Sequence, residues 1–372
     1  MTLDPTHLTP AASLNRVRIV DLPGIALDDA IRGNTAYDLL AARTLAEDVR
    51  RHVGVLGLDV RQGSPDTEIL LAFAHRFEAH DPTIHTAADA ISRRYGRSLG
   101  ALILTLKRGD AINREARPDW DGTYWDYWAG IDAIWLGGGV VSGELGERVR
   151  HHAVVMLAED KAHTCALNLA AHPSFLPLIG AARSVPQADK AALVFDFGQS
   201  TIKRALALYD RGELTALRLL PPLPAPATFS TNGDLTLDQV RDLADRMAAA
   251  MGETWQGVTN PDRVVAPLLV ASIASYEVDG QPLPRQGGPY SQLQRLSDNA
   301  ARWLAYQVGR RVGRPLDVVL IHDGTAAARV YAGKERTAVI MLGTALGVGF
   351  APPATTLTPV APHLIATQEL HH

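Results

Sequence analysis

One segment of the chain combines a carboxylate, a glycine and hydroxyl side chains at a spacing suited to binding phosphate. Residues 196–203, with the sequence DFGQSTIK, form an expected turn between two strands. Gly198 lets the backbone approach a ligand, and successive backbone N–H groups there can surround an anion. Asp196, at the strand end, can hold a hydrated Mg²⁺ ion. An ordinary hairpin turn without a ligand is the alternative. The candidate phosphate-binding residues are Asp196, Gly198, Gln199, Ser200, Thr201 and Lys203.

A second segment places a carboxylate where an expected strand meets a helix. His322-Asp323-Gly324-Thr325 follows the apolar run 317–321 and precedes an alanine-rich stretch. Asp323 can act as a general base if a substrate hydroxyl reaches it. A single aspartate in this position is more often a helix N-cap, so both roles stay open.

Two further glycine-rich turns follow apolar runs. Gly343 and Thr344 form a second glycine-hydroxyl turn, which echoes the turn at residues 198–200 and suggests a duplicated fold. Gly137-Gly138-Gly139 follows the run 131–136 and precedes a helical pattern. This turn could receive a nucleotide or simply join a strand to a helix.

The elements that must position these residues change in type along the chain. Helical periodicity dominates the first half, whereas three strands joined by tight turns predict a β-meander after Pro186. The expected helices are 35–53, one beginning at Pro65, 86–107, 143–156, 237–251, 297–312 and 325–332. The expected strands are 131–136, 191–197, 201–209, 214–220, 264–272, 317–321, 338–342 and 346–350.

Composition limits the class of protein. The chain has 372 residues, a net charge of −4 and 47% hydrophobic residues, as in an ordinary globular protein of two to three domains. The charge balance gives no reason to expect a nucleic-acid or membrane partner. The single cysteine, Cys165, excludes an intrachain disulfide and a multi-cysteine zinc site. We expect a cytoplasmic protein, because no signal peptide or membrane-spanning run is present.

Together the four segments resemble the ROK (repressor, ORF, kinase) group of sugar kinases in the actin, Hsp70 and sugar kinase superfamily. Residues 196–201 are similar to its D-x-G-G-T motif, and residues 321–328 to its E-N-D-A-N-A-A-A motif. Residues 343–349 are similar to its G-T-G-x-G-x-G motif, and residues 136–140 to its nucleotide-binding strand end.

The resemblance implies ATP-dependent phosphorylation of a hydroxyl on a sugar-like substrate, with ATP and Mg²⁺ required. Asp323 would be the general base, Asp196 would orient Mg²⁺, and the glycine turns would bind ATP. Structural zinc is not expected, because the zinc-binding segment of the group is missing. The expected substrate contacts are His322, Thr325, Glu369 and His372.

The order of the motifs differs from that of the group. Gly137 precedes Asp196, whereas the nucleotide turn normally follows both phosphate loops, so we expect a circularly permuted chain. The expected fold is a two-lobed α/β actin-like (ribonuclease H-like) ATPase fold. Residues 1–184 and 335–372 would form the larger lobe, and residues 185–334 the smaller one. The termini should then lie within about 25 Å of each other.

Several residues depart from the motifs and keep other functions open. Gln199 and Ala345 replace glycines, while His322 and Thr325 replace asparagines of the sugar site. A catalytically degenerate sugar or nucleotide sensor on the same fold is therefore one alternative. A scaffold that docks a partner through the aromatic segment 118–128 is another, and a homodimer remains open.

Overall fold

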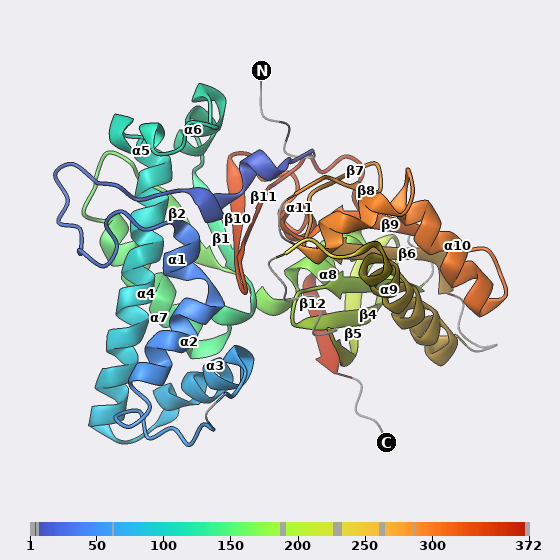
Figure 1. Cartoon of the computed structure of the whole chain (residues 1–372), viewed down its shortest axis with the longest axis horizontal. Helices are drawn as coiled ribbons and strands as arrows, with labels where there is room; N and C mark the ends of the chain where they lie inside the picture. Colours follow the sequence, from blue (N-terminus) through green and yellow to red (C-terminus); the bar gives the residue numbers. More distant parts are fainter. Residues whose placement is uncertain are drawn as a thin grey trace. The chain divides into compact units, whose positions relative to one another are not determined.

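The computed structural model describes the chain except residues 1–3, 5–6, 62, 187–190, 226–232, 260–264, 286–287 and 369–372. It is a mixed α/β protein that divides into two compact units (Figure 1). The first unit contains residues 11–174 and 336–348, and the second contains residues 175–335 and those described from 349 on.

This division differs from the expected lobes in several segments. The described residues of 4–10, residues 175–184, residue 335 and the described residues from 349 on, all expected in the first lobe, belong to the second unit. The physical reason is packing. Helix α8 (Leu176–Arg183) packs against α11 (Asp323–Arg329), and strand β12 (Val360–Gln368) pairs with β5 (Glu213–Pro224).

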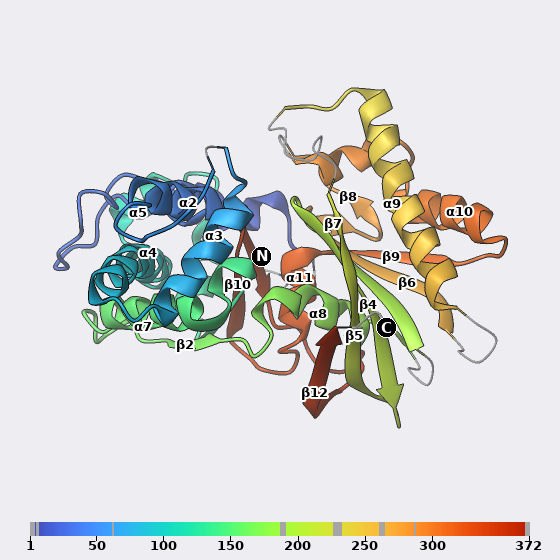
Figure 2. The same cartoon turned by 90° about the horizontal axis from the view of Figure 1, so that it is seen from below.

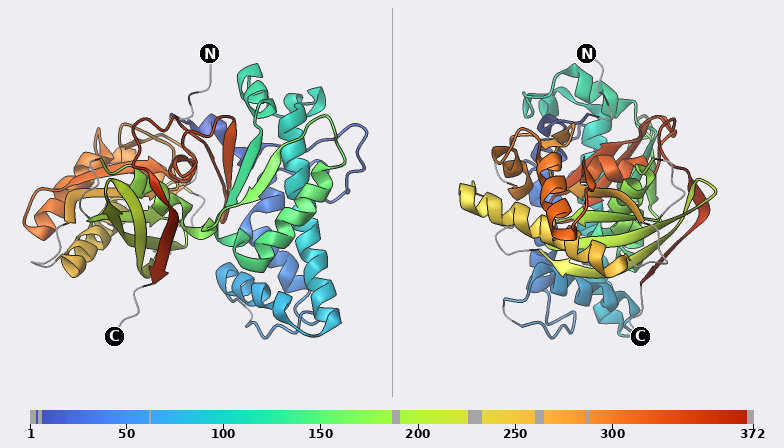
Figure 3. Two further views of the ribbon diagram at one scale, coloured as in Figure 1. Left: turned by 180° about the vertical axis from the view of Figure 1, so that it is seen from behind. Right: turned by 90° about the vertical axis from the view of Figure 1, so that its right-hand side faces the viewer.

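The first unit is a small sheet accompanied by helices. Its strands lie in the order β11-β10-β1-β2, with β1 parallel to both β10 and β2. The long helices α4 and α7 pack against each other (Figure 3, left). The elements are α1 (Ala36–Leu40), α2 (Ala42–Arg51), α3 (Asp66–Ala74), α4 (Pro82–Arg108), α5 (Ala111–Glu115), α6 (Gly122–Ala129), α7 (Gly143–Leu157), β1 (Ala133–Gly137), β2 (Ala166–Leu169), β10 (Thr337–Leu342) and β11 (Leu346–Phe350).

The helix predicted over residues 35–53 is interrupted at Ala41, which has an extended backbone with ψ 145°. Two tertiary hydrogen bonds form at the break. The hydroxyl of Tyr95 donates to Leu40 O at 2.6 Å, and Ala42 N–H donates to Gly343 O at 2.8 Å. The break therefore ties the start of α2 to the turn between β10 and β11.

The second unit has a six-stranded sheet in the order β12-β5-β4-β3-β6-β9. Strands β3, β4 and β5 form the predicted antiparallel meander, and β6 and β9 extend the sheet parallel to β3. Helices α9 and α10 lie on one face and α8 on the other (Figure 2). The remaining elements are β3 (Ala191–Phe197), β4 (Thr201–Asp210), α9 (Leu237–Val258), β6 (Val265–Ile273), β7 (Glu277–Val278), β8 (Gln281–Pro282), α10 (Ala300–Val312) and β9 (Asp317–His322).

Alternation along β3 assigns its side chains to the two faces of this sheet. Leu193, Phe195 and Phe197 pack in the core beneath α9 and α10. Ala192 and Val194 pack in the second core, with α8 and α11. Asp196 continues this second set, so the alternation directs its carboxylate to the α8 and α11 face.

Some elements were not predicted. Residues 122–129 form helix α6, whose Trp125 and Trp128 are each only 1% exposed and thus belong to the core rather than to a docking surface. Strand β12 was not predicted, because Pro362 lacks an N–H group and is unusual inside a strand. Its ladder with β5 is irregular around this residue, between Val360 and Ile365.

Two expectations fall outside the described residues. The chain ends, including Glu369 and His372, are not described, so their separation stays a prediction.

In the part of the chain that is described, no helix combines the length and apolar character needed to cross a membrane.

Helix α11, which carries Asp323, is held by a close backbone contact. A Cβ atom at Gly180 of α8 would lie 1.6 Å from Ala326 O of α11, so only glycine permits this crossing. The contact fixes where α11 begins relative to the sheet, because α8 packs on β3 and β6 as well.

We therefore predict that Gly180→Ala lowers the free energy of unfolding by about 3 kcal/mol, through overpacking against a rigid backbone. Urea denaturation measures this change. The matched control is Gly257→Ala in α9, where a new Cβ would meet nothing within 4 Å. The control should be neutral or stabilising by up to about 1 kcal/mol. Equal effects of the two substitutions would contradict the role of the contact.

Candidate functional site

Three parallel strands of the second unit bring polar side chains together at their carboxyl ends. Asp196 of β3 lies beside Ser272 of β6, and Ser272 lies beside Ile321 of β9 in the strand register. His322 and Asp323 follow directly on β9. Open α/β sheets bind ligands at this edge, so the cluster is the candidate site of the second unit.

The carboxylate of Asp196 is buried, and a hydroxyl group and an ammonium group lie next to its oxygens. The Ser272 hydroxyl donates to Oδ1 at 2.8 Å. Lys203 Nζ lies 3.6 Å from Oδ2, because Lys203 pairs with Asp196 across the β3–β4 ladder. The sequence pointed to Asp196 and Lys203 but not to Ser272. Ser272 could have been recognised as a polar residue at the end of an otherwise apolar predicted strand.

Asp323 occupies the first position of α11, and its side chain is 28% exposed. Its Oδ1 accepts the N–H of Gly324 at 2.6 Å. Burial and, after it, the negative charge of Asp196 raise the pKa of Asp323 to about 7, although the Gly324 N–H, Arg285 and Lys203 act in the opposite direction. The carboxyl group can therefore take up or release a proton near neutral pH.

The sequence left open that Asp323 is the N-cap of a helix. In the structure the N-cap of α11 is His322. The ring Nδ1 of His322 accepts the N–H of Thr325 at 3.2 Å, and the Thr325 hydroxyl lies 3.1 Å from the same nitrogen. His322 and Thr325, both expected to contact substrate, are buried and bonded to each other. Burial and the charge of Arg285 lower the pKa of His322 to about 3, so its ring is neutral near pH 7.

The turn at residues 198–201 is closed by backbone bonds. Gly198 N–H donates to Thr201 O at 3.1 Å, and the Ser200 carbonyl accepts the N–H of Ala225 at 3.2 Å. The Tyr290 hydroxyl donates to Gly198 O at 2.9 Å and so anchors the turn from outside the meander. Nothing in the local sequence pointed to Tyr290, which lies in a short 3₁₀ helix distant along the chain.

The other two predicted turns meet within the first unit, at the ends of β1 and β10. Gly138 has φ +98°, and a Cβ there would lie 2.0 Å from Leu342 O. The turn 137–139 is thereby packed against the start of the Gly343-Thr344 turn. The backbone conformation and the packing of Gly138 therefore explain why it is glycine without any ligand. Neither reason applies to Gly139, where a Cβ would meet nothing within 4 Å.

In the first unit, sequence reasoning missed Asn15. Its side-chain Nδ2 donates to Leu346 O at 2.7 Å, and its Oδ1 accepts Leu346 N–H at 2.9 Å. The amide therefore imitates a neighbouring strand at the beginning of β11, directly after the Gly343-Thr344 turn. β11 is the outer strand of its sheet, so the two bonds satisfy an edge that would otherwise need another partner.

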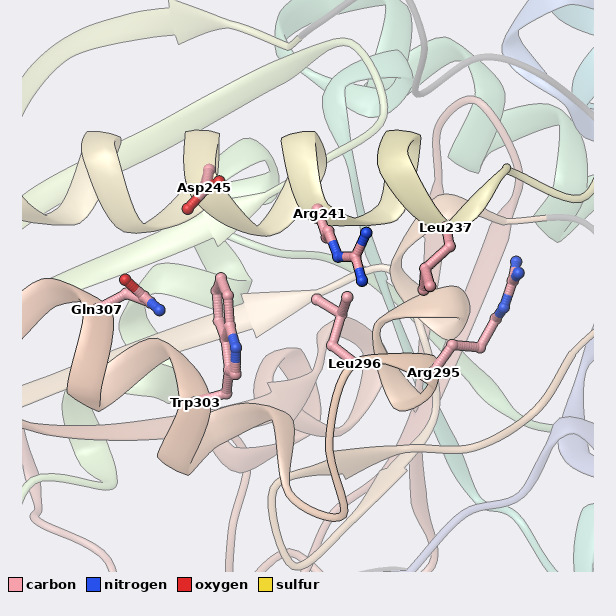
Figure 4. A pocket seen from close by; sticks show the side chains of 7 residues that line it. All are labelled: Leu237, Arg241, Asp245, Arg295, Leu296, Trp303 and Gln307. Atoms are coloured by element: carbon pink, nitrogen blue, oxygen red, sulfur yellow. The ribbon is translucent and has the colours of Figure 1, made fainter.

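A separate cavity of about 350 Å³ lies between α9 and α10, apart from all residues predicted for the site (Figure 4). It is lined by Leu237, Arg241, Asp245, Arg295, Leu296, Trp303 and Gln307. No group of three or more His, Cys, Asp or Glu side chains suited to a metal occurs among the described residues. Any divalent cation at Asp196 would thus need ligands from water and substrate as well.

Comparisons with known proteins leave the family open. No protein-family model matches the chain, and no curated protein matches it. One similar solved structure, the type II variant of the Aquifex aeolicus Ppx/GppA phosphatase, has 13% identity and a TM-score of 0.20 over 38% of this chain and 40% of that chain. A second Aquifex aeolicus Ppx/GppA structure has 14% identity and a TM-score of 0.21 over 38% and 39%. Similarity this weak carries no argument about fold or function.

The raised pKa of Asp323 predicts a pH-dependent difference in stability. Between pH 4 and 7 the folded chain keeps a proton that the unfolded chain has lost, so Asp323 lowers the free energy of unfolding as the pH rises through this window. Asp323→Asn removes the effect. Relative to wild type, the variant should gain on the order of 2–4 kcal/mol from pH 4 to pH 7 and nothing further above it.

Denaturant titrations of both proteins at several pH values measure this difference. Asp317→Asn, on the exposed first residue of β9, is the control and should follow the wild-type curve. A pH-independent difference between Asp323→Asn and wild type would show that the carboxyl group has an ordinary pKa.

Proposed function

We propose that the protein transfers the γ-phosphoryl group of ATP to a hydroxyl group of a sugar-like small molecule. Asp323 accepts the hydroxyl proton while the substrate oxygen bonds to the γ-phosphorus and the bond from phosphorus to the departing ADP oxygen breaks. The observation that carries the proposal is the pair of carboxylates, Asp196 and Asp323, at the carboxyl ends of β3 and β9, two parallel strands separated by β6. The choice of a sugar-like substrate rests on the sequence resemblance.

The protonation behaviour of Asp323 supports its role as the base. General base catalysis is most effective when the pKa of the base lies near the working pH. A solvated aspartate, with a pKa near 3.8, would be a weak proton acceptor, whereas burial and Asp196 raise the pKa here to about 7. A partial exposure of 28% leaves the carboxyl group accessible to a substrate.

The residues around Asp196 fit a hydrated Mg²⁺ ion. Mg²⁺ is usually held by one or two carboxylates together with water and substrate phosphates. Asp196 offers one carboxylate, and the charge of Asp323 acts on the same region. When bound, the ion would neutralise phosphate charge, while Lys203 adds a positive charge 3.6 Å from Asp196. Ser272 keeps the carboxylate oriented.

The strand orders support an actin-like fold with a permuted chain. In the second unit β5-β4-β3-β6-β9 follows the 3-2-1-4-5 order of ribonuclease H-like sheets. In the first unit the order β11-β10-β1-β2 matches 2-1-4-5 of the same pattern when β10 is taken as its strand one. The strands equivalent to four and five, β1 and β2, then precede β10 in the chain, as a permuted chain requires. In both sheets a glycine-hydroxyl turn follows strand one, which is the position we propose for phosphate binding by Gly198–Thr201 and by Gly343-Thr344.

A coupled assay of ADP release, with ATP, Mg²⁺ and a panel of sugars, tests the proposed reaction. Asp323→Asn should lower kcat about 10²- to 10⁴-fold, because the amide cannot accept the proton. Asp317→Asn should retain wild-type turnover. For the wild type, kcat/KM should rise with pH and level off above about pH 7, since only the ionised Asp323 accepts a proton.

Each other outcome points elsewhere. Nucleotide binding without turnover on any sugar would favour the sensor, and wild-type turnover in Asp323→Asn would exclude this residue as the base. Release of inorganic phosphate without a sugar would identify water as the acceptor.

A further inference from the structure

The hydroxyl group of Tyr290 reaches the turn after β3 from a distant part of the second unit. Tyr290 lies in the 3₁₀ helix Pro289–Arg295 and is fully buried, and its ring meets Phe197 edge to face with centroids 6.4 Å apart. The hydroxyl oxygen lies 2.9 Å from Gly198 O. A carbonyl oxygen can only accept a hydrogen bond, so the hydroxyl group is the donor.

The 3₁₀ helix is itself fixed to the segment that precedes α9. The side-chain amide of Gln292 donates to Asp234 Oδ1 at 2.9 Å, and the guanidinium group of Arg295 donates to Leu235 O at 2.5 Å. Leu235 is buried in the core beneath α9 and α10. The hydroxyl group of Tyr290 is therefore presented to the turn by a packed part of the unit.

A hydrogen bond to Gly198 O also orients the next N–H group along the chain. The carbonyl group of Gly198 and the N–H group of Gln199 belong to one peptide unit, and no cis peptide bond occurs among the described residues. In a planar trans peptide the C=O and N–H bonds point in opposite directions. Because the carbonyl oxygen points to Tyr290, the Gln199 N–H points away from Tyr290.

The Gln199 N–H group has no protein acceptor within the described part of the chain. The Gly198 N–H, in contrast, donates to Thr201 O at 3.1 Å. A peptide N–H group without a protein partner is satisfied by water or by a ligand, and oriented N–H groups in turns bind anions. Lys203, on the strand that follows the turn, adds a positive charge.

We propose that Tyr290 is a positioning residue, whose hydroxyl group holds the Gly198–Gln199 peptide so that the Gln199 N–H donates to a phosphate oxygen of ATP. The choice of ATP as the ligand rests on the proposed function. The proposal also accounts for glutamine at a position where the ROK motif has glycine. The donor is a backbone group, which residue 199 supplies whatever its side chain.

Packing in the core is the competing role for Tyr290, and a matched pair of substitutions separates the two. Tyr290→Phe keeps the ring and removes only the donor. Tyr209→Phe is the control, because the Tyr209 hydroxyl also donates to a backbone carbonyl in the second unit, Ala182 O, at 2.9 Å. Each variant loses one hydrogen bond of the same kind, so both should lower the midpoint of urea denaturation to a similar extent.

The proposal predicts that Tyr290→Phe weakens the binding of ATP with Mg²⁺ about 5- to 20-fold, because the peptide is no longer held in the orientation that binds phosphate. Tyr209→Phe should change this affinity less than about twofold. Isothermal titration calorimetry measures the dissociation constants. The same ATP affinity in wild type and Tyr290→Phe, or equal losses in the two variants, would overturn the proposal.

A second measurement follows the donor itself and does not depend on turnover. In ¹H–¹⁵N spectra of the wild-type protein, ATP with Mg²⁺ should move the Gln199 amide proton downfield, and the shift should be smaller in Tyr290→Phe. An unmoved Gln199 amide in a wild-type protein that binds ATP would overturn the proposal even in an active enzyme. Both expected effects in a protein without kinase activity would support the role of Tyr290 and reject only the proposed function. Failure of the wild type to bind ATP would overturn both.

Discussion

Burial of Asp323, reinforced by the negative charge of Asp196, is the constraint on which the candidate site depends. Two carboxylates in a packed environment cannot both ionise at their ordinary pKa, and here Asp323 is the one whose pKa rises. The two carboxylates also have different polar neighbours. Ser272 and Lys203 face Asp196, whereas Asp323 receives one backbone N–H, and its Oδ1 lies 3.2 Å from Nε2 of His322. Under the proposed function, this asymmetry would let one aspartate act as the base and the other as a ligand for the cation.

The backbone is built to keep the two carboxylates close. Asp196 and Asp323 belong to β3 and to the residue following β9, with only β6 between these strands. The start of α11 is set by the contact of Ala326 with Gly180, where no side chain fits. Small errors in either element would change the separation of the carboxylates and with it the pKa of Asp323.

Much of this scaffold could be predicted from the sequence, because buried parallel strands appear as continuous apolar runs. Residues 191–197 and 317–321 were found in this way, and Asp196 and Asp323 were recognised as the polar residues that follow or end them. Proximity of the two was available only through the resemblance. The actual order of strands depends on tertiary pairing that no local pattern encodes.

The parts that escaped prediction share a physical reason, which is that side chains act over long distances in sequence. In the sequence His322 resembles an altered substrate contact, yet its ring accepts a hydrogen bond from Thr325 N–H and stacks on Tyr276. The break in the helix at Ala41 depends on Gly343, some 300 residues away along the chain. Sequence periodicity has no access to such partners.

Burial and the charge of Asp196 together shift the titration of Asp323. A ¹³C carboxyl NMR titration of selectively labelled protein, in wild type and in Asp196→Asn, tests it most directly. We expect a midpoint for Asp323 near pH 7 in wild type and a lower midpoint in the variant. A midpoint near pH 4 in both proteins would contradict it.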